Sequence, residues 1–249
     1  MSGHSKWATT KHRKGAQDKA RAKLFAKLIR QVEVAAREGG GDVSANANLR
    51  AMYQKARDGS VPLDTIERAI KRGTGELDGV RYEQVTYEGY GPGGVAVLVD
   101  TLTDNRNRTG AEMRSIFSRN GGSMAEPGAV AWQFERKGSI EVGRDVDEDT
   151  LMELATDAGA EDLESDPDGF SVTTAPGDLA TVREALEAKG VTVKNAELTM
   201  VPTTTIEVGD ESEAKRVLRL MDAIDDHDDV QNVHANFDIP EAVLAAYDG

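Results

Sequence analysis

The chain has 249 residues, of which 39% are hydrophobic and 30% charged, with a net charge of −14 and no cysteine. This length allows one large domain or two to three small ones, and the hydrophobic content is enough to bury cores. The lack of cysteine excludes disulfides, thiolate zinc sites, iron–sulfur clusters and cysteine nucleophiles, and no apolar run approaches the 18 residues of a membrane span.

Positive charge is concentrated in the first third of the chain. Residues 1–78 contain 16 Lys and Arg against 9 Asp and Glu, a net of +7, whereas residues 79–249 carry a net of −21. Lys and Arg drive phosphate binding by displacing counterions, so the total charge alone would argue against a nucleic-acid partner. The segregation instead indicates a basic region on an acidic body.

The basic region opens with an arm that has no apolar periodicity. HSKWATTKHRKGAQDKARAK (4–23) interleaves Lys and Arg with His4, Trp7 and His12. Such an arm suits phosphate contacts together with a base stacked on the tryptophan. The alternatives are a solvated tail, or an arm folded back on the acidic domains to neutralise them.

Three helices are predicted next. Between residues 18 and 38, apolar side chains recur at three- and four-residue spacing, and Lys and Arg fall on the opposite sector. A second helix is expected at about 45–58, and a third at about 64–72, where Asp64-x-x-Glu67 resembles a capping box. Glycines at 73, 75 and 79 mark a flexible exit.

After residue 80 the pattern changes to short strands separated by helices. Strands are expected at 95–102, 130–135, 203–208 and 230–239, with helices from the capping box Thr109-x-x-Glu112 and over about 211–224. Residues 139–200 between them have the pattern of a complete βαββαβ unit. We therefore predict an α+β fold, with an N-terminal three-helix domain followed by two ferredoxin-like βαββαβ domains, one inserted into the other. The expected boundaries are 1–79, 80–134 plus 203–249, and 135–202.

Two loops resemble anion sites. GYGPGG (89–94) fits the dinucleotide fingerprint G-x-G-x-x-G, but it precedes a strand instead of a helix, so a hairpin turn is the better interpretation. TDNRNRT (103–109) leads into a helix, where free backbone N–H groups, Arg106 and Arg108 could bind an anion. Its polar residues could equally serve as turn and cap while the arginines are solvated.

The acidic run DDHDD (225–229) with His234 suggests a metal site by residue type. A solvated loop between a helix and a strand is the plainer interpretation, because adjacent side chains point in different directions. We therefore predict neither a metal nor a cofactor.

Long segments of the chain resemble the YebC family of probable transcriptional regulatory proteins. They are GHSKW (3–7), KHRKGAQDKARAKLFAKLIR (11–30), IERAIKRGTG (66–75), YEGYGPGGVAVLV (87–99), TDNRNRT (103–109) and FERKG (134–138). The resemblance implies a helical N-terminal domain, two α+β domains and a role in gene expression. It also implies a bacterial protein, while mitochondrial relatives activate translation.

These observations predict a cytoplasmic nucleic-acid-binding regulator of transcription that is not an enzyme and has no membrane partner. MSGHSKW lacks the hydrophobic segment of a secretory signal, and Ser2 stands where myristoylation requires glycine. The expected nucleic-acid contacts are Lys6, Trp7, Lys11, His12, Arg13, Lys14, Lys19, Lys23, Lys27, Arg30, Arg106 and Arg108. The alternative is a translation factor that binds ribosomal RNA, with its acidic domains facing the ribosome or basic proteins. A metal-dependent hydrolase is a remote alternative.

Overall fold

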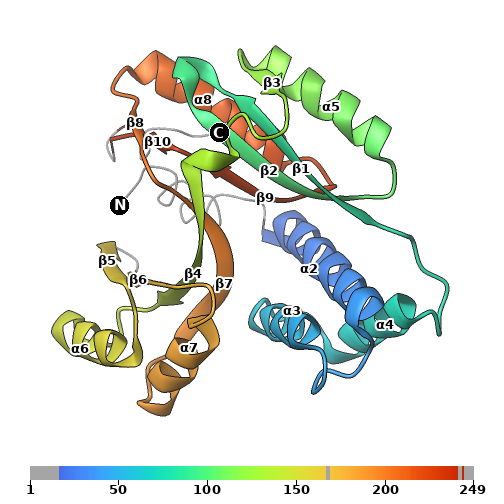
Figure 1. The fold of residues 1–249 in the computed structure, drawn as a ribbon, viewed down its shortest axis with the longest axis vertical. Helices are drawn as coiled ribbons and strands as arrows, with labels where there is room; N and C mark the ends of the chain where they lie inside the picture. Colours follow the sequence, from blue (N-terminus) through green and yellow to red (C-terminus); the bar gives the residue numbers. More distant parts are fainter. Residues whose placement is uncertain (1–16, 167–168, 241–242, 244–249) are drawn as a thin grey trace. The chain divides into compact units, whose positions relative to one another are not determined.

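The computed structural model describes residues 17–166, 169–240 and 243, with all of their side chains except those of residues 17–20 and 166 (Figure 1). The chain forms two compact units. One is Glu135–Val201, and the other combines the residues up to Phe134 with those from Pro202 onward. None of the helices in the described part of the chain combines the length and the hydropathy that a membrane span requires.

The larger unit starts with three helices, which are α2 (Gln17–Gly39), α3 (Ala47–Asp58) and α4 (Leu63–Thr74). Helix α2 packs against both of the others. Their apolar stripes meet in one hydrophobic cluster that includes Leu28, Val32, Leu49 and Ile66, all buried. The predicted three N-terminal helices are confirmed, since the same three- and four-residue spacing that was visible in the sequence fills this core.

Two helices begin at residues other than those of their predicted capping boxes. Helix α4 follows Pro62, and no side chain caps it. Helix α5 (Arg106–Arg119) is capped by Asn105, whose side chain accepts the N–H of Arg108 at 3.1 Å. Asparagine is as good an N-cap as threonine, so the helix starts earlier and Thr109 lies inside it.

A four-stranded sheet with the order β3-β1-β2-β9 forms the rest of the larger unit's core (Figure 1). Its strands are β1 (Glu83–Tyr90), β2 (Ala96–Thr103), β3 (Ser123–Ala125) and β9 (Val230–Ala235). Helices α5 and α8 (Glu211–Asp225) cover one face of the sheet. Val97 and Val99 of β2 share a hydrophobic cluster there with Phe117 of α5 and Leu218 of α8.

Strands β1 and β2 form an antiparallel hairpin, and GYGPGG is its turn. The turn contains the short 3-10 helix η1 (Pro92–Gly94), and the N–H of Gly91 bonds the carbonyl of Val95 at 2.7 Å. Gly93 and Gly94 have φ angles of 72° and 78°, which other residues rarely adopt. The hairpin interpretation is confirmed.

The outer sheet differs from the predicted βαββαβ arrangement. Ala131–Gln133 form a 3-10 helix, η2, and β4 (Phe134–Val142) belongs to the sheet of the inserted unit. Strand β8 (Ile206–Glu207) pairs in parallel with β10 (Phe237–Asp238), outside the four-stranded sheet. The expected strand 230–239 is divided at Asn236, whose side chain accepts the N–H of Ala96 at 2.8 Å and so replaces the backbone as its partner.

One buried carboxylate fixes the loop that precedes η2. Glu88 of β1 is 7% exposed and accepts the backbone N–H groups of Gly128, Val130 and Ala131 at 2.6, 2.7 and 2.9 Å. Burial raises the pKa of Glu88, but these three hydrogen bonds outweigh it and leave the pKa below its usual value.

Both connections to the inserted unit pass through one point, which we call the neck. The carbonyl of Gln133 accepts the N–H and the hydroxyl of Thr203 at 2.8 and 3.1 Å. The side-chain oxygen of Gln133 accepts the amide of Asn236 at 3.0 Å. The residue at which the chain leaves the larger unit, Gln133, is therefore hydrogen-bonded to the residue at which it returns, Thr203.

The inserted unit has the element order β4-α6-β5-β6-α7-β7 and the sheet order β5-β6-β4-β7. The remaining elements are α6 (Glu148–Ala158), β5 (Asp162–Asp166), β6 (Gly169–Thr174), α7 (Leu179–Ala188) and β7 (Val193–Pro202). Ile140 and Val172 of the sheet share a core with Leu151 and Leu186 of the helices. The βαββαβ arrangement predicted for this segment is confirmed.

Candidate nucleic-acid interface

The cationic face of α2 meets the acidic loop, residues 225–229, which joins α8 to β9. The ion pairs are Lys23 Nζ to Asp226 Oδ1 at 2.5 Å, Lys27 Nζ to Asp225 Oδ1 at 3.0 Å, and Arg30 Nη1 to Asp229 Oδ1 at 3.3 Å. Arg30 also donates to the carbonyl of Asp228 at 2.6 Å. Because three and four residues separate these cations, each lies about one helical turn from the next and all face the same way.

Asp229 is the centre of this contact. It is 4% exposed, and its Oδ2 accepts Nη2 of Arg108 and the hydroxyl of Thr109, both at 2.7 Å. Burial is the largest influence and raises the pKa of Asp229, but the hydrogen bonds from Thr109 and Arg108 and the charge of Arg108 together hold this pKa below its usual value. The carboxylate is therefore ionised at neutral pH, and it fixes the acidic loop to the start of α5.

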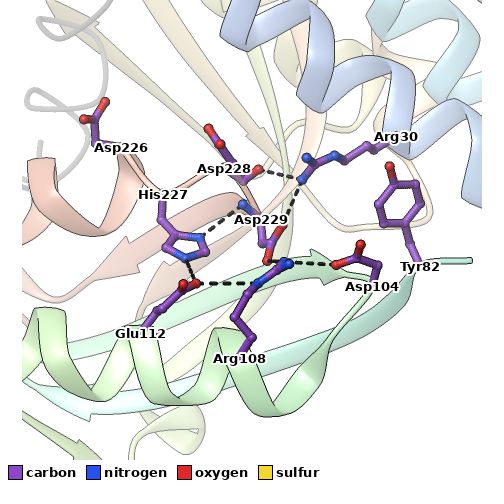
Figure 2. A pocket seen from close by; sticks show the side chains of 9 residues that line it. All are labelled: Arg30, Tyr82, Asp104, Arg108, Glu112, Asp226, His227, Asp228 and Asp229. Carbon is purple, nitrogen blue, oxygen red and sulfur yellow. Dashed lines mark hydrogen bonds and ion pairs between the residues drawn. The ribbon is translucent and has the colours of Figure 1, made fainter. Parts of the chain in front are cut away.

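Figure 2 shows the side chains around Asp229, which line an open cavity of about 590 Å³. Arg108 also pairs with Asp104 at 3.0 Å, and its pKa is raised, chiefly by the hydrogen bond to Asp229. The guanidinium of Arg30 lies 5.3 Å from the ring centre of Tyr82, within the range of a cation–π contact. Seven of the nine lining residues are Asp, Glu or Arg, unlike the mostly apolar linings of pockets that bind small molecules.

Each of the two histidines of this region lies against a carboxylate. His227 Nε2 lies 2.8 Å from Glu112 Oε2, and its Nδ1 accepts the N–H of Asp229 at 3.1 Å. His234 lies further along β9, where its Nε2 is 3.4 Å from Asp100 Oδ2. Within the part of the chain that the structure describes, no three or more His, Asp or Glu side chains are arranged to hold a metal ion.

The residues predicted to contact nucleic acid have different surroundings. Lys6, Trp7, Lys11, His12, Arg13 and Lys14 lie outside the described residues, as does the side chain of Lys19. Lys23, Lys27 and Arg30 meet the acidic loop, and Arg108 meets Asp104 and Asp229. Arg106 is exposed at the first residue of α5.

Further cations lie on the other helices of the N-terminal part. Arg50 and Arg57 of α3 and Arg68 and Lys71 of α4 are exposed. By contrast, Arg37 and Arg72 are drawn to the buried carboxylate of Glu33, at 3.4 and 2.9 Å. The exposed cations extend the positive charge beyond α2, whereas Glu33 neutralises part of it.

The sequence alone does not indicate that the acidic loop is the partner of α2. About 200 residues separate the two segments, and each separately has the composition of a solvated charged surface. The only signal was the alternative in which the basic arm (4–23) folds back on the acidic domains, and it named no contact. Gln31, whose amide donates to Gln231 at 3.3 Å beside the ion pairs, had no signal at all.

Comparison with known proteins identifies similar chains over nearly the whole length. Residues 5–76 match the family described as the TACO1/YebC protein N-terminal domain, and residues 82–237 match the TACO1/YebC second and third domain. A probable transcriptional regulatory protein from Syntrophobacter fumaroxidans is 56% identical over 245 residues, covering 98% of both chains. One from Halothermothrix orenii is 52% identical over 247 residues, again covering 98% of both.

A solved structure is also similar. The crystal structure of a conserved hypothetical protein from Aquifex aeolicus has a TM-score of 0.84 and 46% sequence identity, and the match covers 89% of this chain and 91% of that one. The two proteins therefore share nearly half of their aligned residues as well as the fold.

Proposed function

The chain belongs to the TACO1/YebC family, and from this premise we propose that it is a nucleic-acid-binding regulator of gene expression that acts by binding and not by catalysis. The names of its relatives support the regulatory part, since both relatives described above are called probable transcriptional regulatory proteins. The chemistry of the N-terminal part supports nucleic acid as the partner. A cytoplasmic location is part of the same proposal.

The separation of charge along the chain carries the proposal. The first 78 residues have a net charge of +7 in a protein whose total is −14. Three helices with their own hydrophobic cluster carry the Lys and Arg residues between Arg21 and Arg72, so this part of the charge is held on an ordered surface. Cations held on a scaffold lose less conformational freedom when they bind phosphates than cations on a free chain do.

We propose that the phosphates bind the basic arm and α2, through Lys6, Lys11, His12, Arg13, Lys14, Lys19, Lys23, Lys27 and Arg30. Trp7 would stack on a base, and Arg106 and Arg108 would add contacts at the start of α5. Contacts of this type bind the backbone without reading base sequence, so we expect weak sequence preference.

A salt titration of the full-length protein tests the proposal. Binding to a fluorescent 20-base-pair DNA, and to single-stranded RNA of equal length, would be measured by anisotropy between 50 and 300 mM salt. The logarithm of the binding constant should fall linearly with the logarithm of the salt concentration. The slope should be about 0.9 per neutralised phosphate on duplex DNA and about 0.7 on single strands. Lys14→Glu should weaken binding and reduce this slope, while Lys189→Glu, an equal charge change on an exposed residue of the inserted unit, should alter both less. A protein that binds neither probe at 50 mM salt would contradict the proposal.

A second candidate function is a translation factor that binds ribosomal RNA through the same basic region. The net charge of −21 on residues 79–249 favours it, because an acidic body is repelled by DNA but attracted by basic ribosomal proteins. Crosslinking in cells, followed by sequencing of the recovered nucleic acid, separates the two candidates. Promoter DNA would support transcription, and ribosomal RNA would support translation.

We also propose three domains, at 1–79, 80–134 plus 203–249, and 135–202. Each of these segments has its own cluster of buried apolar residues, which is the physical basis of an independent domain. Limited proteolysis should cut first near residues 75–81, where the described side chains are exposed and no regular element is present. Initial cleavage within α2 or β2 would argue against these boundaries.

A further inference from the structure

The α2 face proposed to bind phosphates is already in contact with carboxylates. Lys23, Lys27 and Arg30 have side chains that are only 26, 13 and 22% exposed, because the acidic loop covers them. Carboxylate and phosphate oxygens make the same charge-assisted hydrogen bonds with ammonium and guanidinium groups. A nucleic-acid backbone and the acidic loop therefore require the same donors.

The acidic loop is also held independently of α2, by α8 and by the start of α5. Asp225 is the last residue of α8, Asp226 is its C-cap, and Asp229 is held by Thr109 and Arg108. The loop can therefore keep its conformation when α2 moves away from it. The acidic loop, which supplies the acceptor carboxylates, therefore stays in place, while α2, which carries the donor cations, can move.

The contact between α2 and this region of the sheet is polar. The cluster that contains Leu28 and Val32 shares no residue with the cluster that contains Phe117 and Leu218. The contacts that join the two sides include the three ion pairs, the hydrogen bond from Arg30 to the carbonyl of Asp228, the Gln31–Gln231 hydrogen bond and the contact of Arg30 with Tyr82. Solvent reaches the Lys23–Asp226 pair, since the side chain of Asp226 is 81% exposed, and such pairs are weak. Salt screens the attraction between the cations and the loop, so rising salt should favour opening of this contact.

We propose that the acidic loop is an intramolecular competitor of the nucleic-acid backbone for the cationic face of α2. In the closed state its carboxylates occupy Lys23, Lys27 and Arg30, and a polyanion binds this face only after the loop has been displaced. The inference rests on the proposed function, because it describes how that site is regulated. Its physical result is that the observed affinity equals the intrinsic affinity multiplied by the fraction of open molecules.

The test neutralises two carboxylates of the loop and leaves Asp229 in place. Asp225→Asn combined with Asp226→Asn removes two ion pairs, and it also removes negative charge from a helix C-terminus, where such charge is unfavourable. The fold is therefore expected to survive. The affinity for the 20-base-pair DNA should rise about two- to thirtyfold, which is the range covered by two ion pairs of this exposure.

The matched control is Glu153→Gln combined with Asp157→Asn, which makes the same change in net charge on two exposed residues of α6. If both double variants tighten binding equally, general repulsion between the protein and the DNA explains the gain and the competition is refuted. If the loop variant binds DNA as tightly as the unaltered protein, or more weakly, the ion pairs do not compete with DNA for α2. The proposal is then also refuted.

A second measurement follows opening without nucleic acid. Since the chain has no cysteine, Ala51→Cys on α3 and Ser212→Cys on α8, both at exposed positions, can be labelled with a fluorophore pair. Energy transfer should fall as salt is raised from 50 to 500 mM, and it should fall at low salt when the DNA is added. Unchanged transfer in the salt series overturns the competition, even if the protein binds no nucleic acid. Salt-dependent transfer without any DNA or RNA binding would support the opening and refute the proposed function instead.

Discussion

Replacing Asp229 by asparagine should destabilise the larger unit, because this carboxylate accepts two short hydrogen bonds in a buried position. A hydrogen bond to a charged group contributes about 1.5–3 kcal/mol, compared with about 1 kcal/mol for a neutral one. Asparagine retains an acceptor oxygen but loses the charge, so each bond should weaken by about 1 kcal/mol. The ion pair with Arg30 is longer, at 3.3 Å, and adds little. We therefore expect a loss of about 2 kcal/mol in the free energy of unfolding at pH 7.

Urea denaturation between pH 3 and pH 7 provides the assay. The pKa of Asp229 in the folded protein is lowered, so its stabilising effect is complete above the unfolded pKa of about 3.9 and is lost as the pH falls through the folded value. The gap between the two proteins should be constant from pH 7 to about pH 5 and should narrow below about pH 4. Asp228→Asn is the control, since that side chain is exposed and Arg30 bonds only its backbone carbonyl. Equal stability of Asp229→Asn and the unaltered protein at pH 7 would refute the reasoning, as would an equal loss in the control.

Two further changes test the packing. Glu88→Gln weakens three hydrogen bonds to the backbone around the start of η2, so at about 1 kcal/mol for each bond it should cost about 3 kcal/mol at pH 7. This loss should shrink in acid because the folded pKa of Glu88 is lowered, and urea denaturation measures it, with exposed Glu83→Gln as the control. Gly73→Ala places a Cβ 2.4 Å from the carbonyl oxygen of Glu33 and should cost about 1–3 kcal/mol by forcing α4 away from α2. A thermal midpoint unchanged by Gly73→Ala would contradict the close packing of these helices.

The features that could be predicted from the sequence are those set by local pattern. The buried face of α2 was visible because Leu28 and Val32 recur at helical spacing, and the glycine turn after β1 was visible because a strand follows it. The first residue of α5 could not be predicted, because Asn105 and Thr109 are both suitable N-caps. In the structure Asn105 is the cap and the helix begins at Arg106.

The features that could not be predicted depend on pairing between distant segments. Residues 130–135 have the apolar content of a strand, yet Ala131–Gln133 form a short helical turn. Glu88 accepts the backbone N–H groups of Val130 and Ala131 at the start of this turn, so these groups are not available to a neighbouring strand. The partner of Arg30 lies 199 residues away, and Asp229 has no sequence property that distinguishes it from the exposed Asp228 next to it. Pattern identifies which residues are charged, but not which of them will be buried together.

The neck at Gln133 and Thr203 makes the inserted unit a side branch of the chain. Since both ends of the branch are already joined by two hydrogen bonds, the rest of the fold needs only a short bridge there, and closing so small a loop has a low entropic cost. Evolution or an engineer could therefore lengthen, exchange or excise residues 135–201 without changing the register of any strand in the sheet β3-β1-β2-β9. The residues that line the site around Asp229 all lie outside residues 135–201, so each such variant would keep this site unchanged.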